Sequence, residues 1–217
     1  MDSYAGPGCN WAILKQHVVG GTLKTTYSDG RQVIKEYLRL HFPGDLRRRW
    51  KREVNALVRL KQFGIPAPEF QGFERQDSRA VIYRREFIPG RKLSILCHDQ
   101  INPLTEYIAA IHEAGVILCD PSIDNLIITA DCMFMFIDYC QARTFPFKGL
   151  LFYWYVGKEI ARIYCGLLKD DPTKWKTFRK RYQEVAKYRP TAWFLVSLSE
   201  KYWFQRWDLV SFGQNSK

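Results

Sequence analysis

The sequence lacks several features that would assign it to a class of protein at first sight. None of its six cysteines stands in a C-x-x-C pair, so we expect no zinc site. The chain does not open on a signal peptide, which indicates a cytoplasmic protein with reduced, mostly buried thiols. The longest apolar run, residues 150–156, is too short to span a bilayer. The cysteines are Cys9, Cys97, Cys119, Cys132, Cys140 and Cys165.

Internal repeats and low-complexity tracts are also absent from the sequence. With 47% hydrophobic and 25% charged residues, the composition is that of a folded globular protein and excludes a wholly disordered one. At 217 residues, the chain is long enough for one large domain or two small lobes with a real core.

Positive charge is present in excess, with a formal net charge of +11. Such an excess points to a polyanionic partner, which is a nucleic acid, an anionic membrane surface or a phosphorylated substrate. The alternative is a generally basic surface that serves solubility. No nucleic-acid-binding motif accompanies the basic residues, so a nucleic acid is not the partner that we expect.

The N-terminal part has the pattern of an antiparallel sheet. Asp29-Gly30 is a strong hairpin signal, and Gly20-Gly21 permits another close turn between β-rich runs. Lys35 falls on the third of these runs. Five strands are a usual number for a small lobe. We expect them at residues 11–19, 22–27, 31–38, 70–73 and 80–87.

An amphipathic helix is expected over residues 45–63, with Asp45 as its N-cap and Gly64 after its end. Glu53 lies on this helix, 18 residues after Lys35. Each of these residues has an ordinary interpretation when it is considered separately. Glu53 would balance the charge of basic neighbours on a solvated helix face, and Lys35 would be a solvent-facing residue of a strand. In a kinase, a strand lysine that orients ATP phosphates is fixed by a helical glutamate in the same order.

The strongest pattern lies in residues 111–143. Two short apolar runs joined by Ala130-Asp131 predict a hairpin. Asp120 stands five residues before Asn125, at the start of the first run, and Asp138 closes the second. Mg²⁺ prefers a few hard oxygen ligands and leaves its other positions to water and phosphate. The spacing Asp-x-x-x-x-Asn, an apolar strand and Asp is the catalytic-loop and metal-loop layout of kinase-like phosphotransferases.

This layout assigns chemical roles. Asp120 would accept the hydrogen bond, and eventually the proton, of the attacking hydroxyl group. Asn125 and Asp138 would hold Mg²⁺. Lys35, fixed by Glu53, would orient the phosphates of ATP.

Two further segments would meet the nucleotide through their backbone. Gly20-Gly21 would let N–H groups approach the phosphates, although the full G-x-G-x-x-G pattern is absent. The pattern breaks at Phe87-Ile88-Pro89-Gly90, which would be a hinge between lobes. Backbone groups near Glu86 and Ile88 would meet the adenine ring there.

Six short motifs follow one another in an order typical of one family. They are Val33-Ile34-Lys35, Arg52-Glu53, Gly64-Ile65-Pro66-Ala67-Pro68, Glu86-Phe87-Ile88-Pro89-Gly90, Asp120-Pro121-Ser122-Ile123-Asp124-Asn125 and Ile137-Asp138. Together they resemble the bacterial lipopolysaccharide-kinase group, the Kdo and heptose kinases, over roughly residues 10–170. The resemblance implies ATP and Mg²⁺ as cofactors, and a sugar hydroxyl of a lipopolysaccharide core or lipid A-type glycolipid as phosphate acceptor.

The resemblance also implies a fold. It is an α+β, two-lobed, protein-kinase-like fold with an N-terminal antiparallel sheet and one helix in residues 1–88. Residues 89–217 form a mainly helical C-terminal lobe that carries the catalytic and metal loops.

Three positions depart from the kinase pattern. Leu118 stands where the catalytic loop usually has His, and Ser122 where protein kinases often have Lys. Tyr139 and Cys140 follow Asp138 without the glycine of D-F-G. Two alternatives therefore stay open, a small atypical Ser/Thr protein kinase and a non-catalytic kinase-like binding module. The absence of A-P-E after Asp138 favours the sugar-kinase branch.

The C-terminal part is expected to be helical. A helix that begins at Asn102 and ends at Gly115 carries His112, which we interpret as a hydrogen-bonded core residue and not as a base. The other expected helices are residues 151–168, 173–187 and 191–204.

Basic and aromatic residues together favour a contact with anionic lipid headgroups, at the inner face of the inner membrane. For most of the tryptophans, however, we expect a place in the core. The residues concerned are Arg47, Arg48, Arg49, Lys51, Arg52, Lys174, Lys176, Arg179, Lys180, Arg181, Trp175, Trp193, Trp203 and Trp207.

Overall fold

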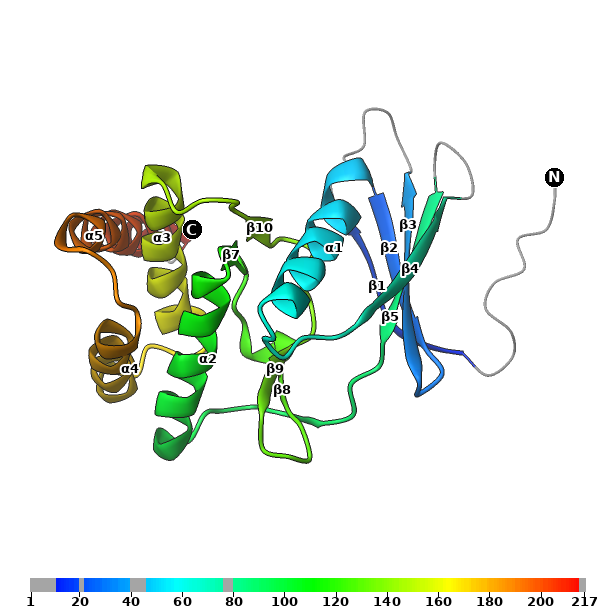
Figure 1. The fold of residues 1–217 in the computed structure, drawn as a ribbon, viewed down its shortest axis with the longest axis horizontal. Coiled ribbons are helices and arrows are strands. Elements are labelled where there is room, and N and C mark those ends of the chain that lie inside the picture. Colours follow the sequence, from blue (N-terminus) through cyan, green and yellow to red (C-terminus); the bar gives the residue numbers. More distant parts are fainter. Residues whose placement is uncertain (1–10, 20–21, 40–45, 76–79, 215–217) are drawn as a thin grey trace.

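The computed structural model describes residues 11–19, 22–39, 46–75 and 80–214. They form an N-terminal antiparallel sheet with one helix on it, followed by a mainly helical C-terminal part (Figure 1). The α+β fold class expected from the sequence is confirmed. Helix α1 (Leu46–Gln62) packs against the sheet on one side and against β7 (Val116–Ile117) and β10 (Arg143–Thr144) of the C-terminal part on the other.

The N-terminal sheet has five strands in the order β1-β2-β3-β5-β4, and every neighbouring pair is antiparallel. The hairpin between β2 and β3 forms because Asp29 accepts backbone hydrogen bonds from Arg31 and Gln32, at 2.8 and 2.7 Å. Gly30 completes the turn with a φ of +84°. The strands are β1 (Ala12–Val19), β2 (Thr22–Ser28), β3 (Gln32–Arg39), β4 (Phe70–Arg75) and β5 (Ala80–Glu86).

Helix α1 (Leu46–Gln62) covers one face of this sheet with an apolar stripe. Trp50, Leu57 and Leu60 recur at helical spacing and are buried. Burial of each leucine stabilises the fold by about 1.5–3 kcal/mol. Gly64, just beyond the helix, has a φ of +66°, a left-handed conformation that ends helices.

Helix α3 (Leu150–Gly166) is the centre of the C-terminal part, because its residues Phe152, Val156 and Ile160 are fully buried. The last helix runs to Gln214 and is longer than the sequence predicted. The remaining elements are β6 (Arg91–Lys92), α2 (Ile101–Glu113), β7 (Val116–Ile117), β8 (Leu126–Ile128), β9 (Phe134–Phe136), β10 (Arg143–Thr144), α4 (Pro172–Val185) and α5 (Pro190–Gln214).

The chain between β9 and α3 is tied to the strand that precedes Asp120. Strands β10 and β7 pair in antiparallel fashion. The backbone N–H of Phe145 donates to the carbonyl oxygen of Gly115 at 2.8 Å. Gly115 has a φ of +76°, and a Cβ there would lie 2.5 Å from the oxygen of Phe145. Only glycine fits this approach.

The expectation of mostly buried thiols is wrong. Among the cysteines in the described ranges, Cys97, Cys132 and Cys165 are exposed, while Cys119 and Cys140 are half-buried. Cys132 lies in the tight turn between β8 and β9, where no interior is available to its side chain. Within residues 11–19, 22–39, 46–75 and 80–214, no helix combines the length and apolar character needed to cross a membrane.

Helices α3 and α5 approach each other closely at Gly157. A Cβ at Gly157 would lie 2.3 Å from the carbonyl oxygen of Val196 and 2.7 Å from Cβ of Ser199. The hydroxyl of Ser199 donates to the carbonyl oxygen of Trp154 at 2.6 Å, which fixes the two helices at this distance. The packing of α5 therefore depends on the absence of a side chain at this position.

Gly157→Ala is expected to lower the free energy of unfolding by about 1–3 kcal/mol, because an added methyl group overpacks the contact between α3 and α5. Urea unfolding followed by circular dichroism measures the change. Gly149→Ala is the control, since the nearest atom to a Cβ there is 3.6 Å away on the Phe147 ring. Equal losses in the two variants would contradict the prediction.

Candidate active site

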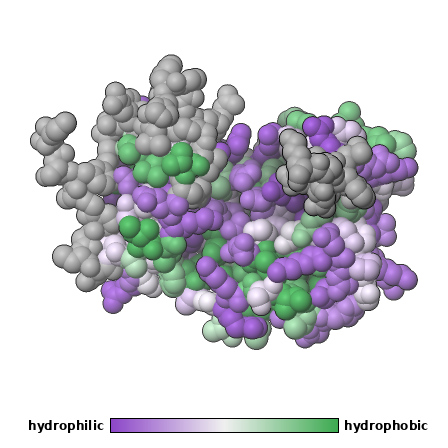
Figure 2. All heavy atoms as spheres, turned by 180° about the vertical axis from the view of Figure 1, so that it is seen from behind, coloured by the Kyte–Doolittle hydropathy of each residue, from purple (hydrophilic) through white to green (hydrophobic). Residues whose placement is uncertain are grey.

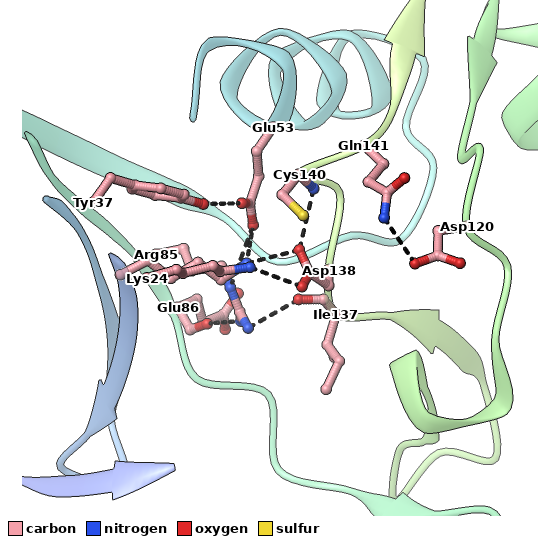
Figure 3. A network of polar contacts seen from close by, with 11 residues as sticks. Lys24, Tyr37, Glu53, Arg85, Glu86, Asp120, Ile137, Asp138, Cys140 and Gln141 are labelled. Carbon is pink, nitrogen blue, oxygen red and sulfur yellow. Dashed lines mark hydrogen bonds and ion pairs between the residues drawn. The ribbon is translucent and has the colours of Figure 1, made fainter. Parts of the chain in front are cut away.

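Residues 137–141, the segment that follows β9, connect the elements of the site. The backbone N–H of Ile137 donates to the carbonyl oxygen of Asn125 at 2.8 Å. The N–H of Cys140 donates to Oδ1 of Asp138 at 3.1 Å and orients that carboxylate. Gln141 donates from Nε2 to Oδ2 of Asp120 at 3.0 Å (Figure 3). One short segment thus carries Asp138 and contacts both Asn125 and Asp120.

Lys35 and Glu53 meet beneath the sheet, where α1 faces β3. The Lys35 ammonium lies 2.5 Å from Oε1 of Glu53 and 3.1 Å from Oδ1 of Asp138. Tyr37, two residues along β3 and therefore on the same face, donates to Oε2 of Glu53 at 3.3 Å. Glu53 is fully buried and Lys35 is 2% exposed. The structure therefore places three of the residues singled out in the sequence in direct contact.

Lys24 of β2 is a member of this cluster that the sequence analysis missed. Its ammonium lies 3.0 Å from Oδ2 of Asp138, and the residue is buried. The signal that could have revealed it is the register of the hairpin. Thr26 pairs with Lys35, and Lys24 lies two residues before Thr26 on the same face.

The electrostatics of the cluster favour the ionised forms of Asp138 and Lys24. Burial alone would raise the pKa of Asp138, but the charges of Lys35 and Lys24 hold it well below its usual range. Burial alone would lower the pKa of Lys24, but the charge and hydrogen bond of Asp138, together with the charges of Cys140 and Glu53, raise that pKa. Both groups are thus charged at neutral pH.

Asp120 lies at the edge of the site, with its side chain 31% exposed. Arg162 of α3 donates to its Oδ1 at 2.7 Å, and this partner was also missed in the sequence. Cys119, the residue before Asp120, has a φ of +63°, a conformation that non-glycine residues adopt rarely.

A buried polar chain holds Cys119 in that conformation. Its backbone N–H donates to Oε2 of Glu159 at 2.6 Å. The other oxygen of Glu159 lies 2.8 Å from Nε2 of His112, whose Nδ1 contacts the hydroxyl of Tyr182 at 2.5 Å. His112 and Tyr182 are fully buried and Glu159 is 1% exposed. His112 is therefore a hydrogen-bonded core residue, as the sequence predicted.

The residues predicted to contact the nucleotide through their backbone lie around the end of β5 or outside the described residues. Glu86 ends β5, and its carbonyl oxygen accepts from Nη1 of Arg85 at 2.8 Å. The same guanidinium donates from Nη2 to the carbonyl oxygen of Ile137 at 3.0 Å, which links this strand to the segment that follows β9. Ile88 is half-buried in the connection that follows β5. Gly20 and Gly21 lie outside the described residues.

Metal binding at this site would involve few protein ligands. Among the residues that the structure describes, no group of three or more His, Cys, Asp or Glu side chains could hold a metal ion. Asp138 and Asn125 are joined only through the backbone bond of Ile137. Such a pair of oxygen donors suits Mg²⁺, which keeps several waters or phosphate oxygens.

Comparisons with known proteins bear on the fold. No protein-family model and no curated protein matches the sequence. The co-crystal structure of WbdD with the kinase inhibitor LY294002 is similar over 87% of this chain and 45% of the WbdD chain, with 16% identity and a TM-score of 0.54. This chain thus spans less than half the length of that protein. At this identity the likeness shows a kinase-like fold.

Two further solved structures give lower scores. A high-resolution crystal structure of WbdD has 14% identity and a TM-score of 0.48, and the match covers 87% of this chain and 50% of the WbdD chain. A structure of the bifunctional kinase-methyltransferase WbdD also has 14% identity and a TM-score of 0.48, with 82% and 47% covered.

Glu159→Ala is expected to lower the free energy of unfolding by about 2–4 kcal/mol, because it leaves the Cys119 N–H and His112 without their buried acceptor. Thermal and urea unfolding measure the loss. Glu184→Ala removes an exposed carboxylate from α4 and is expected to change stability by less than about 0.5 kcal/mol. A Glu159 variant as stable as that control would refute the supporting role.

Proposed function

We propose that the protein is an ATP- and Mg²⁺-dependent kinase that phosphorylates a sugar hydroxyl of a lipopolysaccharide core or lipid A-type glycolipid. One observation carries the proposal. The Lys35–Glu53 ion pair of the sheet and α1 meets Asp138, and the segment that bears Asp138 also bonds to Asp120 and Asn125. Phosphoryl transfer needs this combination of positioning groups and charges, and little covalent chemistry from the protein.

The described residues fit an anionic ligand. Three buried cations, Lys24, Lys35 and Arg85, face two carboxylates, Glu53 and Asp138. Figure 3 shows four of these side chains, those of Lys24, Arg85, Glu53 and Asp138, turned toward one another. One positive charge is therefore uncompensated among them. Nε of Arg85 is buried and has no hydrogen-bond partner among the described residues. Buried cations without partners are costly, and a polyphosphate would neutralise the excess.

In this proposal each residue has a defined task. Asp120 orients the acceptor hydroxyl and takes its proton on a carboxylate oxygen, and its partial exposure leaves it accessible. Lys35, held by Glu53, contacts phosphate oxygens. Asn125 and Asp138 provide oxygen ligands for Mg²⁺. Bound ATP with Mg²⁺ supplies the transferable phosphoryl group.

The nucleotide contacts through backbone groups belong to the same proposal. Gly20 and Gly21 would approach the phosphates, and Glu86 and Ile88 the adenine ring. The boundary between the two lobes would then fall after residue 88. Arg85 supports this position, because it bonds to the carbonyl oxygens of both Glu86 and Ile137.

Asp120→Asn is expected to lower Mg²⁺-dependent ATP turnover in the presence of a glycolipid extract roughly 10²- to 10⁴-fold, because the amide cannot accept the hydroxyl proton. Asp138→Asn is expected to abolish turnover. ADP release and transfer of labelled phosphate into the lipid fraction measure the effect. Asp124→Asn, at an exposed neighbouring position, is the control that retains activity.

The outcomes separate the alternatives. Label in a protein band and not in the lipid fraction would make the chain a protein kinase. If wild-type protein is silent and ATP with Mg²⁺ does not raise its melting temperature, the catalytic proposal fails. A non-catalytic kinase-like binding module would then be the better description.

We also propose that the C-terminal part rests on anionic lipid headgroups at the inner face of the inner membrane. A cavity of about 360 Å³ is lined by three basic residues of α4, Lys176, Lys180 and Arg181, together with Thr177 and Glu184 of α4 and Asn102 of α2. On the face shown in Figure 2, apolar residues form groups separated by hydrophilic ones. Trp175 and Trp193 are half-buried and pack against the core, as expected for most tryptophans.

Lys176→Ser with Lys180→Ser is expected to weaken binding to vesicles containing anionic lipid roughly 30-fold, because each lysine near such a surface contributes about 1 kcal/mol. Co-sedimentation at increasing anionic lipid content measures the binding. Lys15→Ser with Lys61→Ser removes the same charge from exposed positions of the N-terminal part and is expected to leave the binding unchanged. Sedimentation that does not depend on anionic lipid would disprove membrane association through charge.

A further inference from the structure

Both carboxylate oxygens of Asp138 are occupied by lysine ammonium groups. Lys24 lies 3.0 Å from Oδ2, and Lys35 lies 3.1 Å from Oδ1. The backbone N–H of Cys140 also donates to Oδ1 at 3.1 Å. A divalent cation repels ammonium groups and needs a carboxylate oxygen for itself. At least one of the two ammonium groups must therefore leave Asp138 when a metal ion binds there.

Of the two lysines, Lys24 is the one that can leave. Lys35 has a second anionic partner, the fully buried Glu53, at 2.5 Å. Among the described residues, the Lys24 ammonium has Asp138 as its one hydrogen-bond partner, and its other contact is the Tyr37 ring at 5.8 Å. Among the described residues, Asp138 is thus the one carboxylate that holds the Lys24 ammonium by a hydrogen bond.

A displaced Lys24 needs a new anion. Lys24 is 4% exposed and stands on β2, so its charge has little access to water. An unpaired buried cation costs several kcal/mol in general. The carboxylate of Glu53 is already shared by Lys35, Tyr37 and, at 3.9 Å, the guanidinium of Arg85. The anion must therefore come with the metal.

We propose that Lys24 is a second phosphate-binding lysine, which holds Asp138 in the free protein and passes to a phosphate oxygen when a metal–polyphosphate complex binds. This inference rests on the proposed function and deepens it. Two lysines on adjacent strands then contact the polyphosphate from one face of the sheet, while Asp138 turns to the metal. The exchange conserves charge pairing throughout, since each cation always has an anionic partner.

The role of Lys24 is tested by the binding of three probes to the full chain, measured calorimetrically. The probes are Mg²⁺ with tripolyphosphate, Mg²⁺ with ATP, and adenosine. In Lys24→Met, we expect the dissociation constants of both polyphosphates to rise at least tenfold and that of adenosine to stay unchanged. Lys24→Arg keeps the charge and is expected to recover part of the affinity. Lys51→Met, an exposed lysine on α1, is the matched control.

A second measurement needs no variant and holds even if Lys24→Met fails to fold. An acyl-phosphate derivative of tripolyphosphate acylates lysines that touch its phosphates, and peptide mass spectrometry identifies them. We expect labels on Lys24 and Lys35, both suppressed by excess tripolyphosphate with Mg²⁺, and none on Lys51. A label on Lys35 without one on Lys24 would overturn the inference.

The inference and the proposed function can fail separately. If tripolyphosphate binding depends on Lys24 but ATP is not turned over, the phosphate-binding role of Lys24 is supported and the proposed kinase activity is contradicted. If ATP is turned over and Lys24→Met binds polyphosphate with unchanged affinity, the kinase proposal is supported and the inference is contradicted. Lys24 would then serve only as a counter-ion of Asp138. Failure of the wild-type protein to bind either polyphosphate would overturn the inference.

Discussion

The carboxylate of Asp138 pairs with lysines from two neighbouring strands and so joins the N-terminal sheet to the loop that follows β9. A buried charged group is stable only when a group of opposite charge pairs with it, and removal of one partner leaves the other desolvated and unpaired. Without Asp138, Lys35 would keep its ion pair with Glu53, whereas the Lys24 ammonium would face mainly the ring of Tyr37. The mutual position of sheet and loop is therefore set by this pairing.

A second polar chain supports residues 118–125, where the sequence predicts a catalytic loop. Leu118, where kinases usually have His, is buried in the core, and it offers no hydrogen bond from its side chain. The loop is instead fixed through the backbone of Cys119 by Glu159, which His112 positions from α2. The replacement of the usual kinase His by Leu118 thus removes one side-chain hydrogen bond, while Glu159 still holds the backbone of the loop at Cys119.

Local patterns made much of the fold predictable. The Asp29-Gly30 turn, the strand alternation around Lys35 and the helical stripe around Glu53 are short-range signals, and they place five strands and α1 correctly. The contact between Lys35 and Glu53 could be expected from their order in the chain. Lys24 required the register of the hairpin between β2 and β3 as well, because a lone strand lysine has no distinguishing neighbour in sequence.

Contacts between distant elements account for the other omissions. Arg162 and Glu159 reach the catalytic loop across 42 and 40 residues of chain, and no periodicity reports such contacts. The burial of cysteines was misjudged because their average preference for the interior says nothing about a turn such as that of Cys132. The identity of the phosphate acceptor depends on how side chains from distant parts of the chain are arranged in space, and the sequence alone does not give that arrangement.

The tie between β7 and β10 has a consequence for control. Protein kinases commonly switch by ordering a long segment after the metal loop. Here that segment is short, and it is paired to β7 and bonded from Phe145 to Gly115. Arg143 also stacks on the Tyr155 ring of α3 at 4.5 Å. A change of conformation in this segment would therefore first have to break the strand pairing with β7 and the stacking on α3.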